Sequence, residues 1–203
     1  MRYKHLEFKF TQLLALILYK SILTWLPGSY SPYGGKYMRR LRYLCCKNIF
    51  LECGKNVNVE RRAKFGSGFR LKIGDNSSIG INCYLPGDIE IGKDVMMGPN
   101  CYFLSANHAF ERTDIPMRLQ GGSGARKAII EDDVWIGRDV LFTPGRTVRK
   151  GSIVAARCVL SKDFPEYSII GGNPPRLIRN RKEIHLKGDK IKDNELEKVD
   201  SNN

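Results

Sequence analysis

Large apolar residues recur at every sixth position through most of the chain. One run places them at Ile73, Ile79, Leu85, Ile91, Met97 and Phe103, and a second run at Ile130, Ile136, Phe142, Val148, Val154 and Leu160. A shorter set, Cys53, Val59 and Phe65, precedes them. Four residues after most of these positions stands a small or β-branched residue, such as Ser77, Cys83 or Val134. Neither the helical period of 3.6 residues nor the strand period of 2 explains this repeat.

A six-residue period predicts a solenoid of very short strands that are joined by tight turns. The large residue of each repeat points into the coil, the small one fits beside it, and Gly, Asn and Asp occupy the corners. About fifteen hexapeptides, three to a coil, give about five coils and a stack of ~24 Å at the spacing of paired strands. Cys83, Cys101 and Cys158 fall on the small inward position, where we expect compact apolar fillers. The sequence therefore predicts an all-β solenoid.

The repeat is interrupted at two places. The step from Phe65 to Ile73 is longer than six residues, and the repeat is absent from residues 104–129. The second segment is polar and rich in glycine, and a loop of this length within a compact domain is usually functional. We expect residues 104–129 to leave the coils as a long loop. Arg146 stands where a small inward residue is expected, and the sequence offers no reason for it.

Residues 1–50 follow a different pattern. Leu6, Phe10, Leu13, Leu14, Ile17 and Leu18 have helical spacing, and a Pro- and Gly-containing break separates them from a second predicted helix with Arg39, Arg40, Arg42 and Lys47 pointing outward. An open solenoid end exposes unpaired strand edges, so we expect residues 1–50 to form a helical cap. The coils are predicted to span residues 51–182, and residues 183–203 to form a flexible polar tail.

The net charge of +13 is concentrated near the N-terminus, because residues 1–72 hold 15 Lys and Arg against 3 Asp and Glu. Such a segment fits an anionic partner, but a solvated face beside an acidic neighbouring chain explains it equally well. The apolar run 13–19 lies between Lys9 and Lys20 and is shorter than the ~20 residues that span a bilayer. No signal-peptide pattern follows it, so we expect a cytoplasmic protein.

The six cysteines form no CxxC pair and show no zinc-ligand spacing, and the chain holds only three histidines. We therefore expect no metal site.

Three local motifs accompany the repeat: Ser105-Ala106-Asn107-His108, Val134-Trp135-Ile136-Gly137 and Gly172-Asn173-Pro174-Pro175-Arg176. Together, over residues 50–182, they resemble the bacterial hexapeptide-repeat O-acetyltransferases, a group that includes galactoside, nodulation-factor and surface-polysaccharide acetyltransferases. The resemblance implies a left-handed parallel β-helix, and a homotrimer with active sites between neighbouring coils. It also implies acetyl-CoA as the acyl donor and a sugar or glycan as the acceptor. The left hand rests on the resemblance alone, since the usual crossover rule favours the right hand.

His108 resembles the catalytic histidine of this family. The chemistry supports the same choice, because attack of a sugar hydroxyl on a thioester needs a general base, and an imidazole titrates near neutral pH. His5 and His185 lie in the two terminal segments, away from the repeats. The alternative is a histidine that serves only the structure of the loop.

The resemblance also implies ligand-binding residues. Trp135 matches a tryptophan near the cofactor groove and is expected with Asn82 and Asn107 at the acceptor. The remaining cofactor positions match Ala156, Ser161 and Lys162 along pantetheine and nucleotide, and Arg176 and Arg179 near the CoA phosphates. The alternatives are packing for Trp135, a turn residue for Asn82, and ordinary surface cations for the lysine and arginines.

These observations favour an acetyl-CoA-dependent O-acetyltransferase that acts on a sugar hydroxyl in surface polysaccharide synthesis. An N-acetyltransferase of an amino sugar and a non-catalytic β-helix scaffold remain as alternatives. A γ-type carbonic anhydrase needs three zinc-binding histidines, and only His108 lies within the repeats. We expect no nucleic-acid partner, and we expect the basic N-terminal segment to contact the anionic inner membrane weakly.

Overall fold

The computed structural model describes residues 10–183. The chain begins with helix α1 (Phe10–Leu18), which continues into the π-helical turn η1 (Tyr19–Leu23), and helix α2 (Gly35–Ile49) follows. Thirteen two-residue strands make up the coils: β1 (Glu52–Cys53), β2 (Asn58–Val59), β3 (Lys72–Ile73), β4 (Ser78–Ile79), β5 (Glu90–Ile91), β6 (Met96–Met97), β7 (Tyr102–Phe103), β8 (Ile129–Ile130), β9 (Trp135–Ile136), β10 (Leu141–Phe142), β11 (Thr147–Val148), β12 (Ile153–Val154) and β13 (Val159–Leu160). The longer strands β14 (Ser168–Gly171) and β15 (Arg176–Asn180) end the fold.

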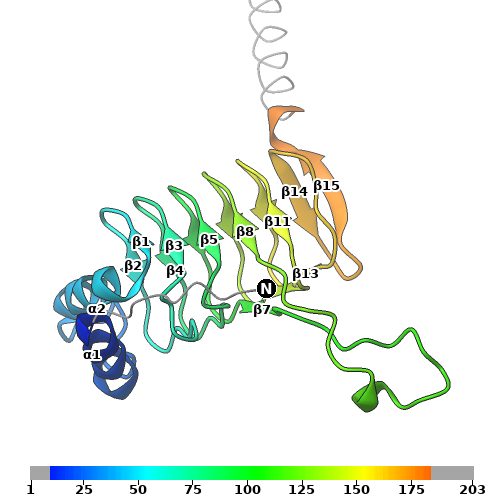
Figure 1. Cartoon of the computed structure of the whole chain (residues 1–203). Coiled ribbons are helices and arrows are strands. Elements are labelled where there is room, and N and C mark those ends of the chain that lie inside the picture. Colours follow the sequence, from blue (N-terminus) through cyan, green and yellow to red (C-terminus); the bar gives the residue numbers. More distant parts are fainter. Residues whose placement is uncertain (1–9, 184–203) are drawn as a thin grey trace, which may run out of the picture.

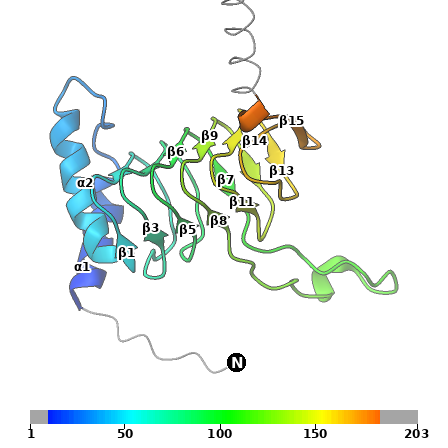
Figure 2. The ribbon, with the colours of Figure 1, turned by 90° about the horizontal axis from the view of Figure 1, so that it is seen from above.

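The coils stack into a prism with three faces (Figures 1 and 2). The first face has the strand order β1-β3-β5-β8-β11. The second face begins with β2-β4 and continues through β6-β9-β12-β14-β15, joined where the Ser78 amide donates to the Val95 carbonyl. The third face contains β7-β10-β13, and single bridges extend it from Tyr102 through Tyr84 to Lys64. The coil strands pair in parallel, as a β-helix requires, and only β14 and β15 are antiparallel.

The register stacks the periodic residues on one another, which confirms their predicted inward direction. Ile73 pairs with Ile91, and Ile91 with Ile130, along the first face. On the third face the rings of Phe103 and Phe142 stack with centroids 4.0 Å apart and planes 3° apart. Their side chains, like most of the others in the repeat, are almost completely buried.

The three cysteines at the small inward position are confirmed as fillers. Cys83, Cys101 and Cys158 are completely buried. Burial raises the pKa of the Cys158 thiol, so this side chain stays neutral and behaves as a small apolar group.

The corners explain the Asn and Asp residues of the repeat. Between the second and third faces each coil places one residue in the left-handed backbone region, and the series is Arg62, Asn82, Asn100, Asp139 and Arg157, with φ of 57–61°. Asn and Asp tolerate this conformation best among residues with a Cβ. Their side chains also form a ladder, since Asn82 donates to Asn100 at 3.1 Å and Asn100 to Asp139 at 2.8 Å. This last hydrogen bond is the main cause that lowers the pKa of Asp139.

The predicted helical cap covers the first coil (Figure 1), but one predicted outward residue points inward. Arg42 is completely buried, so its outward placement was wrong. Its guanidinium donates to the carbonyls of Val59 at 2.7 Å and Pro27 at 2.9 Å, and to Ser29 Oγ at 3.1 Å. Glu60 lies 3.8 Å from it. Arg42 lies on the face of α2 that also buries the two cysteines of this helix, so its guanidinium meets carbonyls of the cap and of the first coil.

Arg146 has a similar role at another corner. Its guanidinium donates to the carbonyls of Pro144 and Ser161 at 3.2–3.3 Å and lies 3.4 Å from a carboxylate oxygen of Asp163. A long side chain therefore stands at this position in place of a small one, because its guanidinium donates hydrogen bonds to the carbonyls of the turn.

The long loop leaves the coils between the third and first faces. Strand β7 ends at Phe103 and β8 begins at Ile129, so the loop spans residues 104–128. A 3₁₀ turn, η2 (Met117–Leu119), lies within it. In both views the loop extends away from the prism (Figures 1 and 2). Of the predicted tail 183–203, all but Glu183 lies outside the described residues.

Candidate active site

His108 lies in a short two-stranded ribbon at the root of the loop. It forms an antiparallel bridge with Gly122. On one side the Ala109 amide donates to the Gly121 carbonyl at 3.1 Å, and on the other the Ser123 amide donates to the Asn107 carbonyl at 2.8 Å. The ribbon therefore fixes the backbone of His108 although the residue itself is exposed.

Asn107 is held in the same ribbon by its main chain. Its amide donates to Ser123 Oγ at 3.2 Å, and the Ser123 hydroxyl donates back to the Asn107 carbonyl at 3.1 Å. Within residues 10–183 no hydrogen bond or ion pair engages the imidazole of His108. The ring is thus fixed at its base and open at its tip, which suits a base that must reach a substrate.

Several predicted cofactor residues share the second face. Trp135 lies in β9 with its indole half exposed, between Met96 and Ile153 in the strand register. Arg176 and Arg179 lie in β15, which is three strands away along the same sheet, or about 14 Å at normal strand spacing. Both arginines are exposed. Exposed guanidinium groups at one end and an indole at the other can bind an elongated ligand with a phosphate end.

The other predicted residues lie around the second and third faces. Ala156 precedes the corner residue Arg157, at the corner that also carries Asn82 three coils earlier. Ser161 and Lys162 follow β13 on the third face, where the Lys162 ammonium lies 5.4 Å from the centroid of the Phe164 ring.

One chain does not bring these residues to His108. The histidine projects with the loop between the third and first faces, whereas Trp135 and the two arginines belong to the second face. Among the residues that the structure describes, no side-chain hydrogen bond, ion pair or ring contact joins His108 to Asn82 or Trp135. A single copy therefore presents separate halves of the predicted site.

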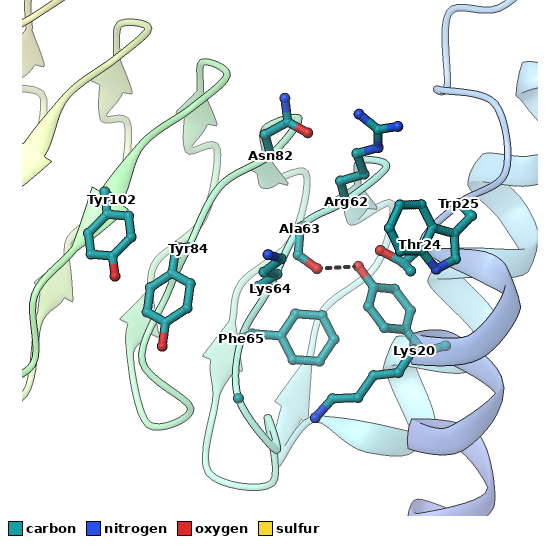
Figure 3. A pocket seen from close by; sticks show the side chains of 12 residues that line it. Lys20, Thr24, Trp25, Arg62, Ala63, Lys64, Phe65, Asn82, Tyr84 and Tyr102 are labelled. Carbon is teal, nitrogen blue, oxygen red and sulfur yellow. Dashed lines mark hydrogen bonds between the residues drawn. The ribbon is translucent and has the colours of Figure 1, made fainter.

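A large cleft, which sequence reasoning missed, adjoins the Asn82 corner. It has a volume of about 850 Å³ and lies between η1 and the third face of the first coils (Figure 3). Its lining residues are Tyr19, Lys20, Thr24, Trp25, Arg62, Ala63, Lys64, Phe65, Gly66, Asn82, Tyr84 and Tyr102. The sequence did hold one signal, since Tyr84 and Tyr102 are outward residues one coil apart and each precedes a periodic inward residue.

Two general features of the described chain bear on function. Between residues 10 and 183 no cluster of three or more His, Cys, Asp or Glu side chains is arranged to hold a metal ion. The helices of this range are also too short or too polar to cross a membrane.

The repeat itself has known relatives. Residues 70–104 match the family model of the bacterial transferase hexapeptide (six repeats). A putative acetyltransferase of Saccharomyces cerevisiae is 34% identical over 135 residues, which cover 66% of this chain and 67% of the relative. The chain belongs to the hexapeptide-repeat acetyltransferases. As in the solved members of this family, its fold is a left-handed parallel β-helix, which confirms the predicted fold class.

Other hexapeptide-repeat acetyltransferases resemble the chain over similar lengths. The galactoside O-acetyltransferase of Escherichia coli is 30% identical over 66% of this chain and 65% of that protein. A putative colanic acid biosynthesis acetyltransferase of the same organism is 26% identical over 80% of this chain and 83% of that protein. Coverage is lower elsewhere: the chain spans 58% of a putative acetyltransferase of Schizosaccharomyces pombe and 44% of a probable one of Mycobacterium tuberculosis.

Solved structures show the same similarity. A hexapeptide-repeat-containing acetyltransferase of Vibrio cholerae superposes with a TM-score of 0.68 and 28% identity, over 84% of this chain and 90% of that one. The same protein has also been crystallised with acetyl-CoA, and that structure superposes with a TM-score of 0.65.

Proposed function

We propose that this protein transfers an acetyl group from acetyl-CoA to a hydroxyl of a sugar, with His108 as the general base. The observation that carries the proposal is the position of His108, fixed in the ribbon by its backbone while its imidazole meets no partner within residues 10–183. Relatives that are named as galactoside and colanic acid acetyltransferases support a sugar acceptor. We further propose that the acceptor belongs to a surface polysaccharide.

The reaction needs one base and correct positioning. The neutral imidazole of His108 takes the proton of the acceptor hydroxyl as its oxygen attacks the thioester carbonyl. The new C–O bond forms, the C–S bond breaks, and the imidazolium returns its proton to the departing thiolate of CoA. The chain itself supplies the base and holds both substrates, and no metal is needed for this step.

The donor is proposed to lie along the second face and past β13. The indole of Trp135 offers an apolar surface near the thioester end, with Ala156 and Ser161 along the pantetheine. Lys162, Arg176 and Arg179 would bind the phosphates at the nucleotide end, since exposed cations form charge-assisted hydrogen bonds with phosphate oxygens. The acetyl-CoA complex of the Vibrio cholerae relative supports this donor.

We propose a homotrimer in which the loop of one copy completes the site of the next. The separation of His108 from Trp135 within one chain supports this arrangement, as do the exposed apolar side chains of Met96 and Trp135 on the second face. Sedimentation equilibrium should give about three times the chain mass of 23.1 kDa. Mixing His108→Ala with Trp135→Ala chains should restore activity, because some mixed sites regain both residues. Mixed chains that stay as inactive as either parent would contradict the shared site.

The helical cap is proposed to contact anionic membrane weakly. Helix α1 exposes Phe10, Leu14 and Ile17, and residues 10–49 contain no Asp or Glu. An apolar helix face beside cations is typical of peripheral binding at an anionic lipid surface. Flotation with vesicles at low salt should recover the protein with anionic lipid only. Equal recovery with neutral and anionic vesicles, or none with either, would leave the cap with a structural role alone.

The activity itself is tested by CoA release. Acetyl-CoA is offered with a panel of hydroxyl sugars and of matching amino sugars, and free thiol is measured. O-acetylation predicts release with hydroxyl sugars, and mass spectrometry of the product then shows an ester. Release with amino sugars alone would identify an N-acetyltransferase. No release with any acceptor, in a protein that binds CoA, would favour a non-catalytic scaffold.

A further inference from the structure

The floor of the cleft beside Asn82 consists of buried aromatic side chains that are held in place by their contacts. The hydroxyl of Tyr19, a residue that is 2% exposed, donates to the Ala63 carbonyl at 2.9 Å. The ring of Phe65 lies against Tyr19 with centroids 4.8 Å apart. Burial is the main cause that raises the pKa of Tyr19, so its hydroxyl remains a donor. The floor therefore joins η1 firmly to the third face.

The walls of the cleft are aromatic. The rings of Tyr84 and Tyr102 stack with centroids 4.6 Å apart and planes 8° apart, and both are partly exposed (Figure 3). Trp25, which is 65% exposed, stands on the opposite side (Figure 3). Flat rings with an outer polar group are the surface on which the C–H face of a sugar ring packs, and pockets for small ligands are generally lined in this way.

The charges of the cleft are all positive. Lys20, Arg62 and Lys64 line it, and no Asp or Glu does. In the described range 10–183 none of these three cations forms an ion pair, although the Arg62 guanidinium lies 5.5 Å from the centroid of the Trp25 ring.

The cations of the first face differ from those of the cleft, because they form ion pairs with carboxylates. There Lys72 pairs with Glu52, Lys127 with Glu90, and Arg149 with Glu131. Cations that are gathered in a cleft without such partners repel one another, and a bound anion removes that repulsion.

We propose that the cleft holds the acceptor glycan and that this glycan carries a negative charge. The anion is a carboxylate of an acidic sugar, or a phosphate that links the sugar to a nucleotide or a lipid. It binds between Lys20, Arg62 and Lys64, while the sugar ring packs on the face of Tyr84 that is turned away from Tyr102. This inference rests on the proposed acetyltransferase function and narrows its acceptor class.

The kinetic test compares acceptors that differ only in charge. A neutral methyl glycoside, the corresponding uronic acid, the sugar 1-phosphate, a nucleoside diphosphate sugar and a polyprenyl diphosphate sugar are each offered with acetyl-CoA. We expect at least one anionic form to have a kcat/KM about tenfold or more above the neutral form. The anionic form with the highest value identifies the source of the charge. Equal values for all forms would overturn the proposal while leaving the transferase activity in place.

Two substitutions test the cations with little risk to the fold. Arg62→Asn places at this corner the residue that the next two coils have there, at Asn82 and Asn100, so the left-handed turn is preserved. Lys64→Gln changes an exposed side chain. Each should lower kcat/KM for the anionic acceptor about tenfold and lower that for the neutral glycoside much less. Lys93→Gln, an exposed cation at the corner after the first face, is the matched control and should change neither.

A binding measurement separates failure of this proposal from failure of the proposed function. Calorimetric titration of the full chain with the anionic and the neutral sugar, without acetyl-CoA, needs no catalysis. Tighter binding of the anionic sugar that Arg62→Asn abolishes supports the cleft even if no acetyl transfer is found. Equal binding of both sugars, or tight binding that survives both substitutions, would refute it.

Discussion

The regular coils and the segments that leave them differ in how their side chains are buried. In the coils a side chain such as Phe142 is completely buried and stacked on its counterpart in the coil before it. In the loop 104–128 most residues are exposed, and a short ribbon around His108 fixes the backbone at its root. The comparison indicates that the buried interior of the coils provides stability, whereas the proposed substrate contacts come from the loop and from exposed side chains on the coil faces. Substitutions in the two regions should therefore affect different measurements.

The largest expected effect belongs to the loop. His108→Ala should lower kcat by about 10²–10⁴, the usual contribution of a positioned general base. Its unfolding free energy should change by less than ~1 kcal/mol, as for other exposed residues. Steady-state kinetics and thermal unfolding of the same preparation measure both. Thr113→Ala, an exposed change in the same loop, is the control and should leave kcat unchanged. Substantial turnover by His108→Ala would place the base elsewhere.

Arg42→Met tests the junction between the cap and the first coil. Removing this buried cation leaves Glu60 and the carbonyls of Val59 and Pro27 without their partner, and should cost about 3–5 kcal/mol at pH 7. Chemical denaturation measures this loss of unfolding free energy. The control is Arg40→Met, which changes an exposed residue of the same helix.

The pH dependence of this loss has a definite sign. Burial opposes ionisation of Glu60, but hydrogen bonds from Ser29 and Asn58 and the charge of Arg42 outweigh it, so its pKa is lowered. Wild type therefore gains stability from Glu60 above the unfolded pKa and loses it as pH falls through the folded one. Without Arg42 the buried carboxylate takes up a proton more readily. The stability difference between wild type and Arg42→Met should thus shrink as pH falls below about 4. A difference that is independent of pH would mean that packing, not charge, explains the loss.

A core substitution should show the reverse of the His108 result. Phe142→Ala removes a ring that stacks on Phe103 and should cost about 3–5 kcal/mol of unfolding free energy. Phe142→Leu removes less volume and should cost less than Phe142→Ala. Below the unfolding transition both variants should keep the KM for acetyl-CoA, because the ring is completely buried and does not reach the ligand. A raised KM in well-folded Phe142→Leu would contradict the separation between the buried interior of the coils and their exposed ligand-binding residues.

The sequence predicted the structure of the periodic coils better than that of the aperiodic segments. The repeat predicted the inward direction of residues such as Ile91 and Phe103, because the neighbouring coils impose one environment on each position. It also predicted Asn and Asp at the corners. The pairing of His108 with Gly122 lies in an aperiodic segment, so no sequence pattern predicted it. The buried position of Arg42 was also missed, although it shares a helix face with the buried Cys45 and Cys46, because a cation normally faces solvent and the sequence does not show the carbonyls that accept its hydrogen bonds.

The smallest effect is expected from the proposed phosphate-binding cations. The triple change Lys162→Ala, Arg176→Ala and Arg179→Ala should raise the KM for acetyl-CoA about tenfold or more, since hydrogen bonds to charged groups are among the stronger ones. It should change kcat much less, because contacts far from the thioester stabilise ground and transition states alike. These residues lie outside the coil interior, so unfolding should also change little. An exposed cation at another corner, Lys150→Ala, is the matched control. Acetyl-pantetheine lacks the nucleotide, and the triple variant should use it as well as wild type does. An unchanged KM for acetyl-CoA, or an equal loss with both donors, would show that these cations do not bind the phosphates.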